Sequence, residues 1–141
     1  SIMNMFLNLT EDKESSFDPI PAGTYNLIVT NAEETETKNK DKRIKLTFSV
    51  SEGEYAGRKI FEGYQLSGNE KAVQIGRGQL KSLWKCAGHT EFIIKSAQDF
   101  NNIEIAASVK IQPGKDGYDA KNSISSFKPK IKSVAADATP F

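Results

Sequence analysis

The stretch from Arg43 to Val50 constrains the fold of this chain more than any other feature. Its apolar residues (Ile44, Leu46, Phe48 and Val50) alternate one by one with polar residues (Arg43, Lys45, Thr47 and Ser49). Successive side chains of a β-strand point to opposite faces, so this period of two predicts a half-buried strand. One face of that strand is apolar and belongs in a core, and the other is basic and belongs at the surface.

Four further segments are predicted to be strands, at about 23–33, 58–66, 103–111 and 118–127. In the second of these, Ile60 and Tyr64 fall on one face, whereas Lys59 and Phe61 fall on the other. Residues 34–41 are polar and highly charged, as expected of a hairpin loop. The Pro-Gly and Asp-Gly pairs within 113–117 predict a turn between the last two strands.

One helix is predicted at about 69–87, where apolar residues recur at steps of three and four. Asn69 is a suitable N-cap and Gly88 a suitable residue just beyond the C-terminus. Gly76 and Gly78 argue against the first half of this helix, since each costs about 1 kcal/mol relative to alanine, unless they permit a close packing contact. Residues 92–100 are expected to be a connector, with a short helical turn at 96–100.

The predicted order is three strands, one helix and two strands, which is the element order of the OB-fold. We therefore predict a mainly β protein, a five-stranded OB-fold barrel with one helix between its third and fourth strands. Residues 1–18 are expected to form an extended N-terminal arm, residues 19–131 the barrel and residues 132–141 a flexible tail. Ser1 and Ile2 precede two methionines, so the natural start is expected at Met3 or Met5.

Length and composition narrow the class of protein. The 141 residues, of which 38% are apolar and 26% charged, suit one globular domain. No apolar run is long enough to cross a membrane, and we expect a cytoplasmic protein. A lone cysteine, Cys86, with one histidine nearby, His89, supports neither a disulfide framework nor a zinc site, and no cofactor is expected.

The net charge of +1 hides an asymmetry along the chain. Residues 1–36 hold one basic and seven acidic residues, a net of −6, which leaves +7 for residues 37–141. Two clusters of basic residues within this second part, at 38–45 and at 110–132, have few acidic residues among them. Such clusters can form an anion-binding face, although lysine runs are also common in solvated loops.

Cations that follow phosphates and exposed rings that stack bases are what a single-stranded nucleic acid needs. The candidate DNA-binding residues are Lys38, Lys40, Lys42, Arg43, Lys45, Lys59, Phe61, Lys110, Tyr118, Lys121 and Phe127. For each aromatic residue the alternative is packing in the core, which strand parity favours for Tyr64. Trp84 lies on the apolar stripe of the predicted helix and is expected in the core.

Five motifs along the chain resemble a family of phage proteins first described only as a domain of unknown function. They are Pro21-Ala22-Gly23-Thr24-Tyr25, Glu36-Thr37-Lys38-Asn39, Leu46-Thr47-Phe48, the run Glu52–Phe61 and Ser126-Phe127-Lys128-Pro129. Members of that family act as single-stranded DNA-binding proteins. The resemblance implies an OB-fold, a role in phage DNA replication or recombination, the cytoplasm of a bacterial host and no catalytic residues.

The last residues carry a second resemblance. Asp137-Ala138-Thr139-Pro140-Phe141 is similar to the acidic tip, ending in Pro-Phe, of bacterial single-stranded DNA-binding proteins. That tip recruits replication and repair partners, so Asp137, Pro140 and Phe141 are candidate partner-binding residues. Only Asp137 adds an acid here, where the bacterial tip has several, and a frayed terminus is the alternative interpretation.

Three other classes of function compete with DNA binding. An enzyme is disfavoured, because we find no paired carboxylates in an apolar setting, phosphate-binding glycine loop or nucleophile next to a base. A phage accessory module could use the barrel to bind a recombinase or nuclease. A carbohydrate-binding barrel would favour neutral polar groups over two lysine clusters.

A barrel of this size can act alone, as a homo-oligomer or cooperatively along DNA.

Overall fold

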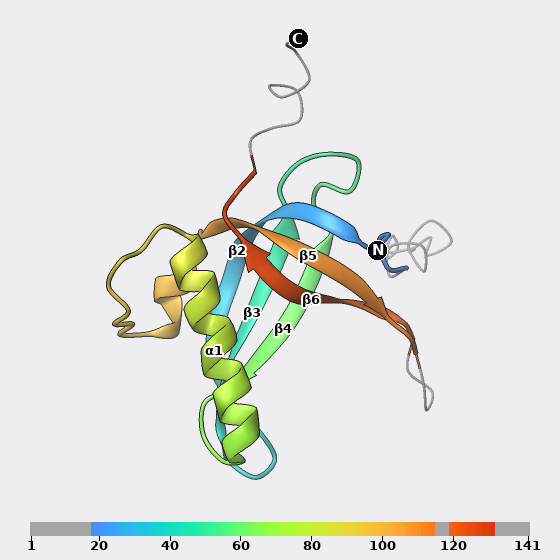
Figure 1. Ribbon diagram of the computed structural model, residues 1–141. Coiled ribbons are helices and arrows are strands. Elements are labelled where there is room, and N and C mark those ends of the chain that lie inside the picture. The colour runs from blue at the N-terminus through green and yellow to red at the C-terminus, as the bar shows by residue number, and fades with distance from the viewer. Residues whose placement is uncertain (1–17, 115–118, 132–141) are drawn as a thin grey trace, which may run out of the picture.

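The computed structural model describes residues 18–114 and 119–131, which form one curved antiparallel sheet and one α-helix (Figure 1). The elements are β2 (Gly23–Glu36), β3 (Lys42–Val50), β4 (Lys59–Gln65), α1 (Glu70–Cys86), a 3-10 turn η3 (Ala97–Phe100), β5 (Glu104–Gln112) and β6 (Lys121–Lys128). The predicted mainly β class, the five strands and the place of the helix are confirmed. The first strand runs three residues further than predicted, and the last begins at Lys121.

Strand β2 is the centre of the sheet, whose order is β4-β3-β2-β5-β6. Its first half, from Gly23 to Ile28, pairs with β5, and the part from Leu27 onward pairs with β3. The register with β3 shifts between Val29 and Asn31, which leaves Thr30 as the extra residue of a β-bulge. Bulges bend a strand and increase its twist. The bulge at Thr30 therefore helps the sheet to curl while β2 pairs with both β5 and β3.

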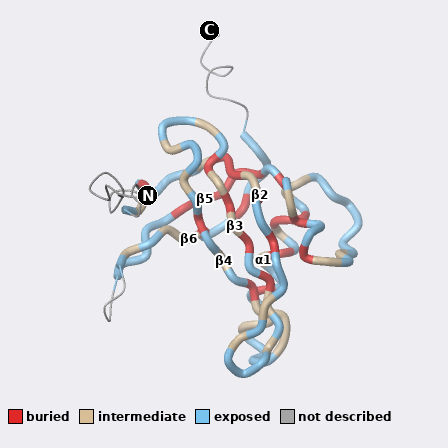
Figure 2. Tube along the Cα trace, turned by 180° about the vertical axis from the view of Figure 1, so that it is seen from behind, coloured by how far each residue is buried: buried red, intermediate tan, exposed pale blue. Residues whose placement is uncertain are grey.

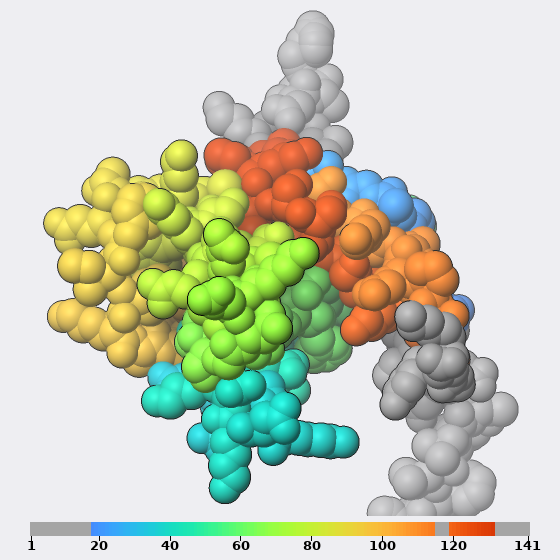
Figure 3. All heavy atoms as spheres, turned by 60° about the horizontal axis from the view of Figure 1, so that its bottom comes forward, coloured from blue at the N-terminus to red at the C-terminus, as the bar shows by residue number. Residues whose placement is uncertain are grey.

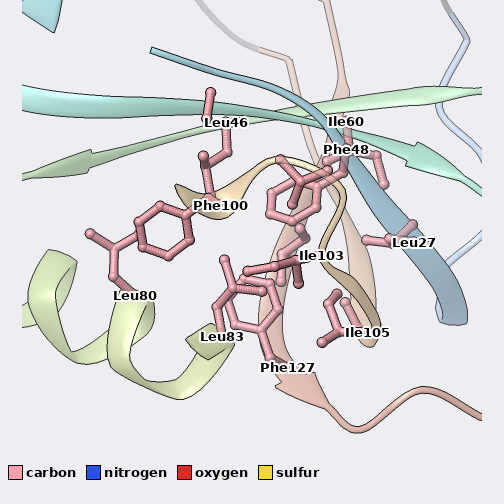
Figure 4. Packing of buried hydrophobic residues seen from close by; sticks show 14 of the residues in the cluster. Leu27, Leu46, Phe48, Ile60, Leu80, Leu83, Phe100, Ile103, Ile105 and Phe127 are labelled. Carbon is pink, nitrogen blue, oxygen red and sulfur yellow. The ribbon is translucent and has the colours of Figure 1, made fainter. Parts of the chain in front are cut away.

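The hydrophobic core lies on the inner face of the curled sheet (Figure 4). Every second residue of β3 is buried, as its alternation predicts, and Phe48 at its centre is fully covered. Helix α1 contributes Leu80, Leu83 and Trp84, and η3 adds Phe100. Viewed from behind, the buried stretches of the strands cluster at the centre of the molecule, and the 91–95 segment is mainly exposed (Figure 2).

The two edges of the sheet, β4 and β6, approach each other without joining. Among the described residues they exchange no backbone hydrogen bonds, so the sheet is not closed. Helix α1 packs against both edges. One side chain bridges them: the carboxylate of Glu62 on β4 accepts a 2.7 Å hydrogen bond from the backbone N–H of Ile124 on β6. The edge-to-edge seam is therefore held by packing and by one carboxylate.

Two asparagine side chains tie the flanking segments to the sheet. Asn122 accepts a hydrogen bond from the N–H of Ile20 and donates one to the C=O of the same residue. Asn26 binds both backbone groups of Ile131 in the same way. Each side-chain amide thus makes the two hydrogen bonds that a neighbouring strand would make to the same residue. Because its amide is paired in this way, the polar side chain of Asn26 can be buried.

The two helix glycines have different environments. A Cβ atom on Gly76 would lie 2.5 Å from the carbonyl oxygen of Gln65, so this glycine permits close packing of α1 on β4. A Cβ atom on Gly78 would meet nothing within 4 Å among the described residues. The expected packing role is confirmed for Gly76, whereas Gly78 contributes no such contact.

The same substitution should therefore have opposite effects at these two positions. We expect Gly76→Ala to lower the free energy of unfolding by about 1–3 kcal/mol, because the new methyl group collides with backbone. Gly78→Ala should raise it by about 1 kcal/mol through helix propensity. Urea titrations of both variants measure this, and stabilisation by both would contradict the close contact at Gly76.

Candidate nucleic-acid interface

The surface of the sheet opposite the core carries the predicted basic strand face. We call it the β3–β4 outer face. It consists of Arg43, Lys45, Thr47 and Ser49 on β3 with Lys59, Phe61, Gly63 and Gln65 on β4. The antiparallel register sets Lys59 beside Ser49, Phe61 beside Thr47 and Gly63 beside Lys45. Because β4 rises by about 3.3 Å per residue, this face extends roughly 20 Å along the strands.

Phe61 is the exposed ring of this face, with 61% of its surface accessible. Its cross-strand neighbour is the small Thr47, and the next outward residue along β4 is Gly63. Neither side chain is large enough to cover the ring. Strand alternation explains the exposure, since Ile60 and Tyr64 take the buried positions of the strand. The ring is therefore exposed on a face that also carries Lys59 and the cations of β3.

The side chain of Arg43 packs on the backbone of Gly63. A Cβ atom at Gly63 would lie 2.4 Å from Nη2 and 2.6 Å from Nε of Arg43, so the guanidinium group lies across the bare backbone of this glycine. Nε of Arg43 is buried and has no hydrogen-bond partner within the described part of the chain. Sequence reasoning missed this role, although a glycine inside a strand is a known signal of a close approach.

The loop before β3 presents the next cations. The hydroxyl of Thr37 accepts hydrogen bonds from the N–H groups of Asn39 and Asp41, and the N–H of Lys40 donates to the Thr37 carbonyl. Lys40 has a left-handed backbone with φ of 67°. This tight turn brings the exposed Lys38, Lys40 and Lys42 to the end of the outer face next to Arg43.

The second basic cluster lies beyond the edge of β4. Lys110 on β5 and Lys121 on β6 are both exposed, and both lie close enough to Glu62 to favour its ionised form. Burial has the larger effect and raises the pKa of Glu62 above its ordinary value, against the opposing hydrogen bond from Ile124. The curl of the sheet thus brings Lys110 and Lys121 near Glu62 at the β4 edge.

The positive surface has an acidic border on β2. Glu33 lies opposite Lys45 in the register and shares the outer face, whereas Glu34, opposite the buried Ile44, has the inner parity. Within residues 18–114 and 119–131, the one ion pair joins Lys130 to Glu104, so Lys45 and Glu33 are not in salt-bridge contact. Within the described residues, the cations of β3 are therefore not paired with a carboxylate.

Phe127 is a correction to the predicted set of rings. It is 7% exposed, and its ring centroid lies 5.9 Å from that of Phe48 in the core (Figure 4). The cause is a bulge in β6: Ile124 pairs with Val109 and Ser126 with Ser108, which leaves Ser125 as the extra residue. Ile124 and Phe127 consequently share the inner face although they are three residues apart. Phe127 is not available to stack a base.

Other predicted residues are placed as follows. Trp84 and Tyr64 are buried in the core, as predicted. His89 stacks on the Trp84 ring with centroids 3.9 Å apart, a contact that sequence spacing did not indicate. Tyr118 and the tail residues Asp137, Pro140 and Phe141 lie outside the described residues.

Comparison with known proteins gives a family. Residues 7–140 match the sequence profile of a family described as "protein of unknown function (DUF669)". The chain belongs to the DUF669 family. A search of curated proteins found no match to it. Membership of DUF669 thus identifies the relatives of this chain but leaves its activity to be argued from the interface.

The described part of this DUF669 protein lacks a metal-binding cluster and a membrane-spanning helix. In residues 18–114 and 119–131, no group of three or more His, Cys, Asp or Glu side chains could hold a metal ion. None of the helices in these ranges has the length and apolar character needed to cross a membrane.

The raised pKa of Glu62 predicts a pH dependence of stability. A carboxyl group whose pKa is raised by folding stabilises the fold below its ordinary pKa and loses this contribution as pH rises through the folded value. Wild type should therefore gain free energy of unfolding relative to Glu62→Gln when pH is lowered from about 7.5 to about 4.5. The glutamine keeps an acceptor for the Ile124 N–H but does not titrate.

Urea titrations of both proteins at the two pH values measure this difference. Glu62→Ala serves as the second variant, since it removes the acceptor and should be less stable than Glu62→Gln at both values. A difference between wild type and the glutamine variant that does not change with pH would contradict a half-buried carboxylate with a raised pKa at the seam.

Proposed function

We propose that this DUF669 protein binds single-stranded DNA, without reading its sequence, on the β3–β4 outer face of an OB-type, partly open barrel. The observation that carries this proposal is the exposed ring of Phe61, which lies among Arg43, Lys45 and Lys59 on a face of otherwise small residues. Single-strand binders combine a cationic track for the backbone with rings on which bases stack.

The topology supports an OB-type barrel. The order β4-β3-β2-β5-β6 places the first strand in the centre, paired with the second and the fourth, and the helix lies between the third and fourth strands. The two edges approach each other at Glu62 and Ile124, as in a barrel that is nearly closed. In OB-folds the second and third strands and the adjoining loops bind oligonucleotides, and here these strands are β3 and β4.

The expected mechanism is equilibrium binding by charge and stacking. The cations of the 37–41 loop, Arg43, Lys45 and Lys59 would follow the phosphates, and Lys110 and Lys121 would extend the track across the β4 edge. Binding releases condensed counterions, so affinity should fall with a log-log slope of about −0.7 for each phosphate neutralised. Phe61 would stack one base, and every base offers a suitable face, which accounts for the absence of sequence readout.

The biological setting of the proposal comes from the resemblance to phage proteins. Binding and protection of single strands would serve phage DNA replication or recombination in the cytoplasm of a bacterial host. Asp137, Pro140 and Phe141 would recruit a replication or repair partner, and Tyr118, which follows β5 in the sequence, would add a second ring. A homo-oligomer on DNA is compatible with this function.

The decisive experiment is a fluorescence-anisotropy titration of labelled dT, about 16 nucleotides long, and of a duplex of equal length at about 50 and 200 mM salt. We expect preference for the single strand and a steep loss of affinity with salt. Equal affinity for both nucleic acids, or binding to neither, would reject the proposal and favour a protein-interaction module.

Replacing the exposed ring tests stacking directly. Phe61→Ala should weaken dT binding by about 1–3 kcal/mol, which is about 5- to 150-fold, without loss of stability. Phe92→Ala is the matched control, because Phe92 is also an exposed phenylalanine but lies beside α1. Equal affinities of wild type and the Phe61 variant would show that this ring stacks no base.

Charge reversal tests the cationic track. Arg43→Glu/Lys45→Glu should lower affinity and reduce the salt slope by about 0.7 for each phosphate contact that is lost. Lys71→Glu/Lys85→Glu on α1 changes the net charge by the same amount and should leave the slope nearly unchanged. An identical loss in both double variants would mean that overall charge, and not the β3–β4 outer face, determines binding.

A further inference from the structure

A second surface lies on the other side of the sheet, between α1 and the segment that follows it. We call it the α1 groove. Its volume is about 700 Å³, and its wall is made chiefly by Ile44, Leu66, Leu80, Phe92, Ile93 and Ile94. In the space-filling view, α1 in light green separates the segment around residues 91–95, in yellow, from β5 and β6 in orange and red (Figure 3). Ile44 belongs to the inner alternation of β3, so this groove and Phe61 face opposite sides of the sheet.

The outer wall of the α1 groove exposes large apolar side chains next to each other. Ile93 is 75% exposed and Phe92 is 45% exposed. Single exposed apolar residues are normal, but adjacent ones that line a concave surface mark interaction sites. Trp84 at the base is already satisfied, since its Nε1–H donates a 2.6 Å hydrogen bond to the Glu91 carbonyl. The groove therefore offers an occupant mainly apolar contact.

The rim of the groove is basic. Arg77 and Lys81 line it, and the Lys81 ammonium lies 5.4 Å from the centre of the Phe92 ring. Helix α1 carries four basic residues and one acidic residue, Glu70, in its first turn. The charge that complements this rim is negative. An occupant thus needs an apolar side chain for the wall and carboxylates for the rim.

Gly78 points independently to an occupant. It lines the groove in the middle of α1, where a glycine costs about 1 kcal/mol relative to alanine. Its neighbour Gly76 is explained by the Gln65 backbone, but no atom within the described residues would contact a Cβ at Gly78. A glycine keeps the helix surface bare where another backbone approaches closely. The helix interior is weakened here without any gain inside the described fold.

We propose that the α1 groove binds an acidic peptide segment of a partner protein, with one bulky apolar side chain against Ile93 and Phe92 and carboxylates beside Arg77 and Lys81. The peptide backbone crosses α1 at Gly78. Nucleic acid suits this surface poorly, because its walls are largely aliphatic and Trp84 is buried. Since the groove and the β3–β4 outer face lie on opposite sides of the sheet, peptide and DNA can be bound at once.

The test uses three fluorescein-labelled decapeptides and the full chain. The first alternates pairs of aspartate with Phe-Leu pairs, the second replaces aspartate by lysine, and the third replaces the Phe-Leu pairs by serine. We expect saturable anisotropy binding of the first peptide alone. Absence of saturable binding of the first peptide, or equal binding of the lysine peptide, would overturn the proposal.

Gly78→Ala provides the sharpest variant, because it separates binding from folding. It should stabilise the protein and yet weaken the acidic peptide at least about fivefold, a combination that damage to the fold cannot produce. Arg77→Glu/Lys81→Glu should weaken it at least about tenfold, whereas Arg43→Glu/Lys45→Glu, with the same net charge but on the other side of the sheet, should stay within about threefold. Unchanged peptide affinity in Gly78→Ala would place the peptide elsewhere.

Other occupants give distinct results. Displacement of the acidic peptide by dT would assign the groove to nucleic acid and overturn the proposal. Self-association in sedimentation that Gly78→Ala abolishes would assign it to a second copy of this chain. The groove variants should bind dT like wild type, so failure of the peptide experiment is independent of whether the β3–β4 outer face binds DNA.

Discussion

The arrangement of the sheet depends on β2, whose first half pairs with β5 and whose second half pairs with β3, with an overlap at Leu27 and Ile28. Up to Ile28 this strand pairs with β5, and the backbone groups of Val29 exchange hydrogen bonds with Ile103 and Asn102. From the bulge at Thr30 onward, its other edge continues along β3 to Glu36. A 14-residue strand can belong to both halves of the sheet only because this irregularity adds the bend that the curl needs. The curl then brings β4 towards β6, and the hydrophobic core lies on the concave face between them.

That curvature separates two surfaces of different chemistry. The inner face takes the large apolar residues of all five strands and is covered by α1 and η3. None of the described residues covers the outer face of β3 and β4 in this way, so the alternation that buries Phe48 and Ile60 exposes Lys45 and Phe61. One binary pattern therefore builds the core and presents the proposed interface at the same time. The α1 groove lies on the inner side of the sheet. Its proposed occupant is an acidic peptide, whereas the proposed ligand of the outer face is DNA.

Glycines mark the close approaches in this structure. Gly76 lets the helix backbone meet β4, and Gly63 lets the guanidinium group of Arg43 lie on β4. Both have contacts that a methyl group would displace, although the flexible arginine can move and the backbone of Gln65 cannot. Gly78 has no contact among the described residues, and it is this contrast with its neighbours that distinguishes the groove from an ordinary surface depression.

The sequence by itself determined the elements that depend on local periodicity: the alternating strand of 43–50, the strand that carries Phe61, the helix with its Asn69 cap, which accepts from the N–H of Ala72, and the order of strands and helix. Tertiary structure alone decided what depends on register and on contacts between distant residues. The bulge at Ser125 directs Phe127 into the core. The curl of the sheet brings Glu62 within hydrogen-bonding distance of Ile124. The guanidinium group of Arg43 packs on the backbone of Gly63. Period-two reasoning assumes that each strand is regular, so one inserted residue reverses its conclusion, and no local pattern reports which side chain will lie across a glycine on another strand.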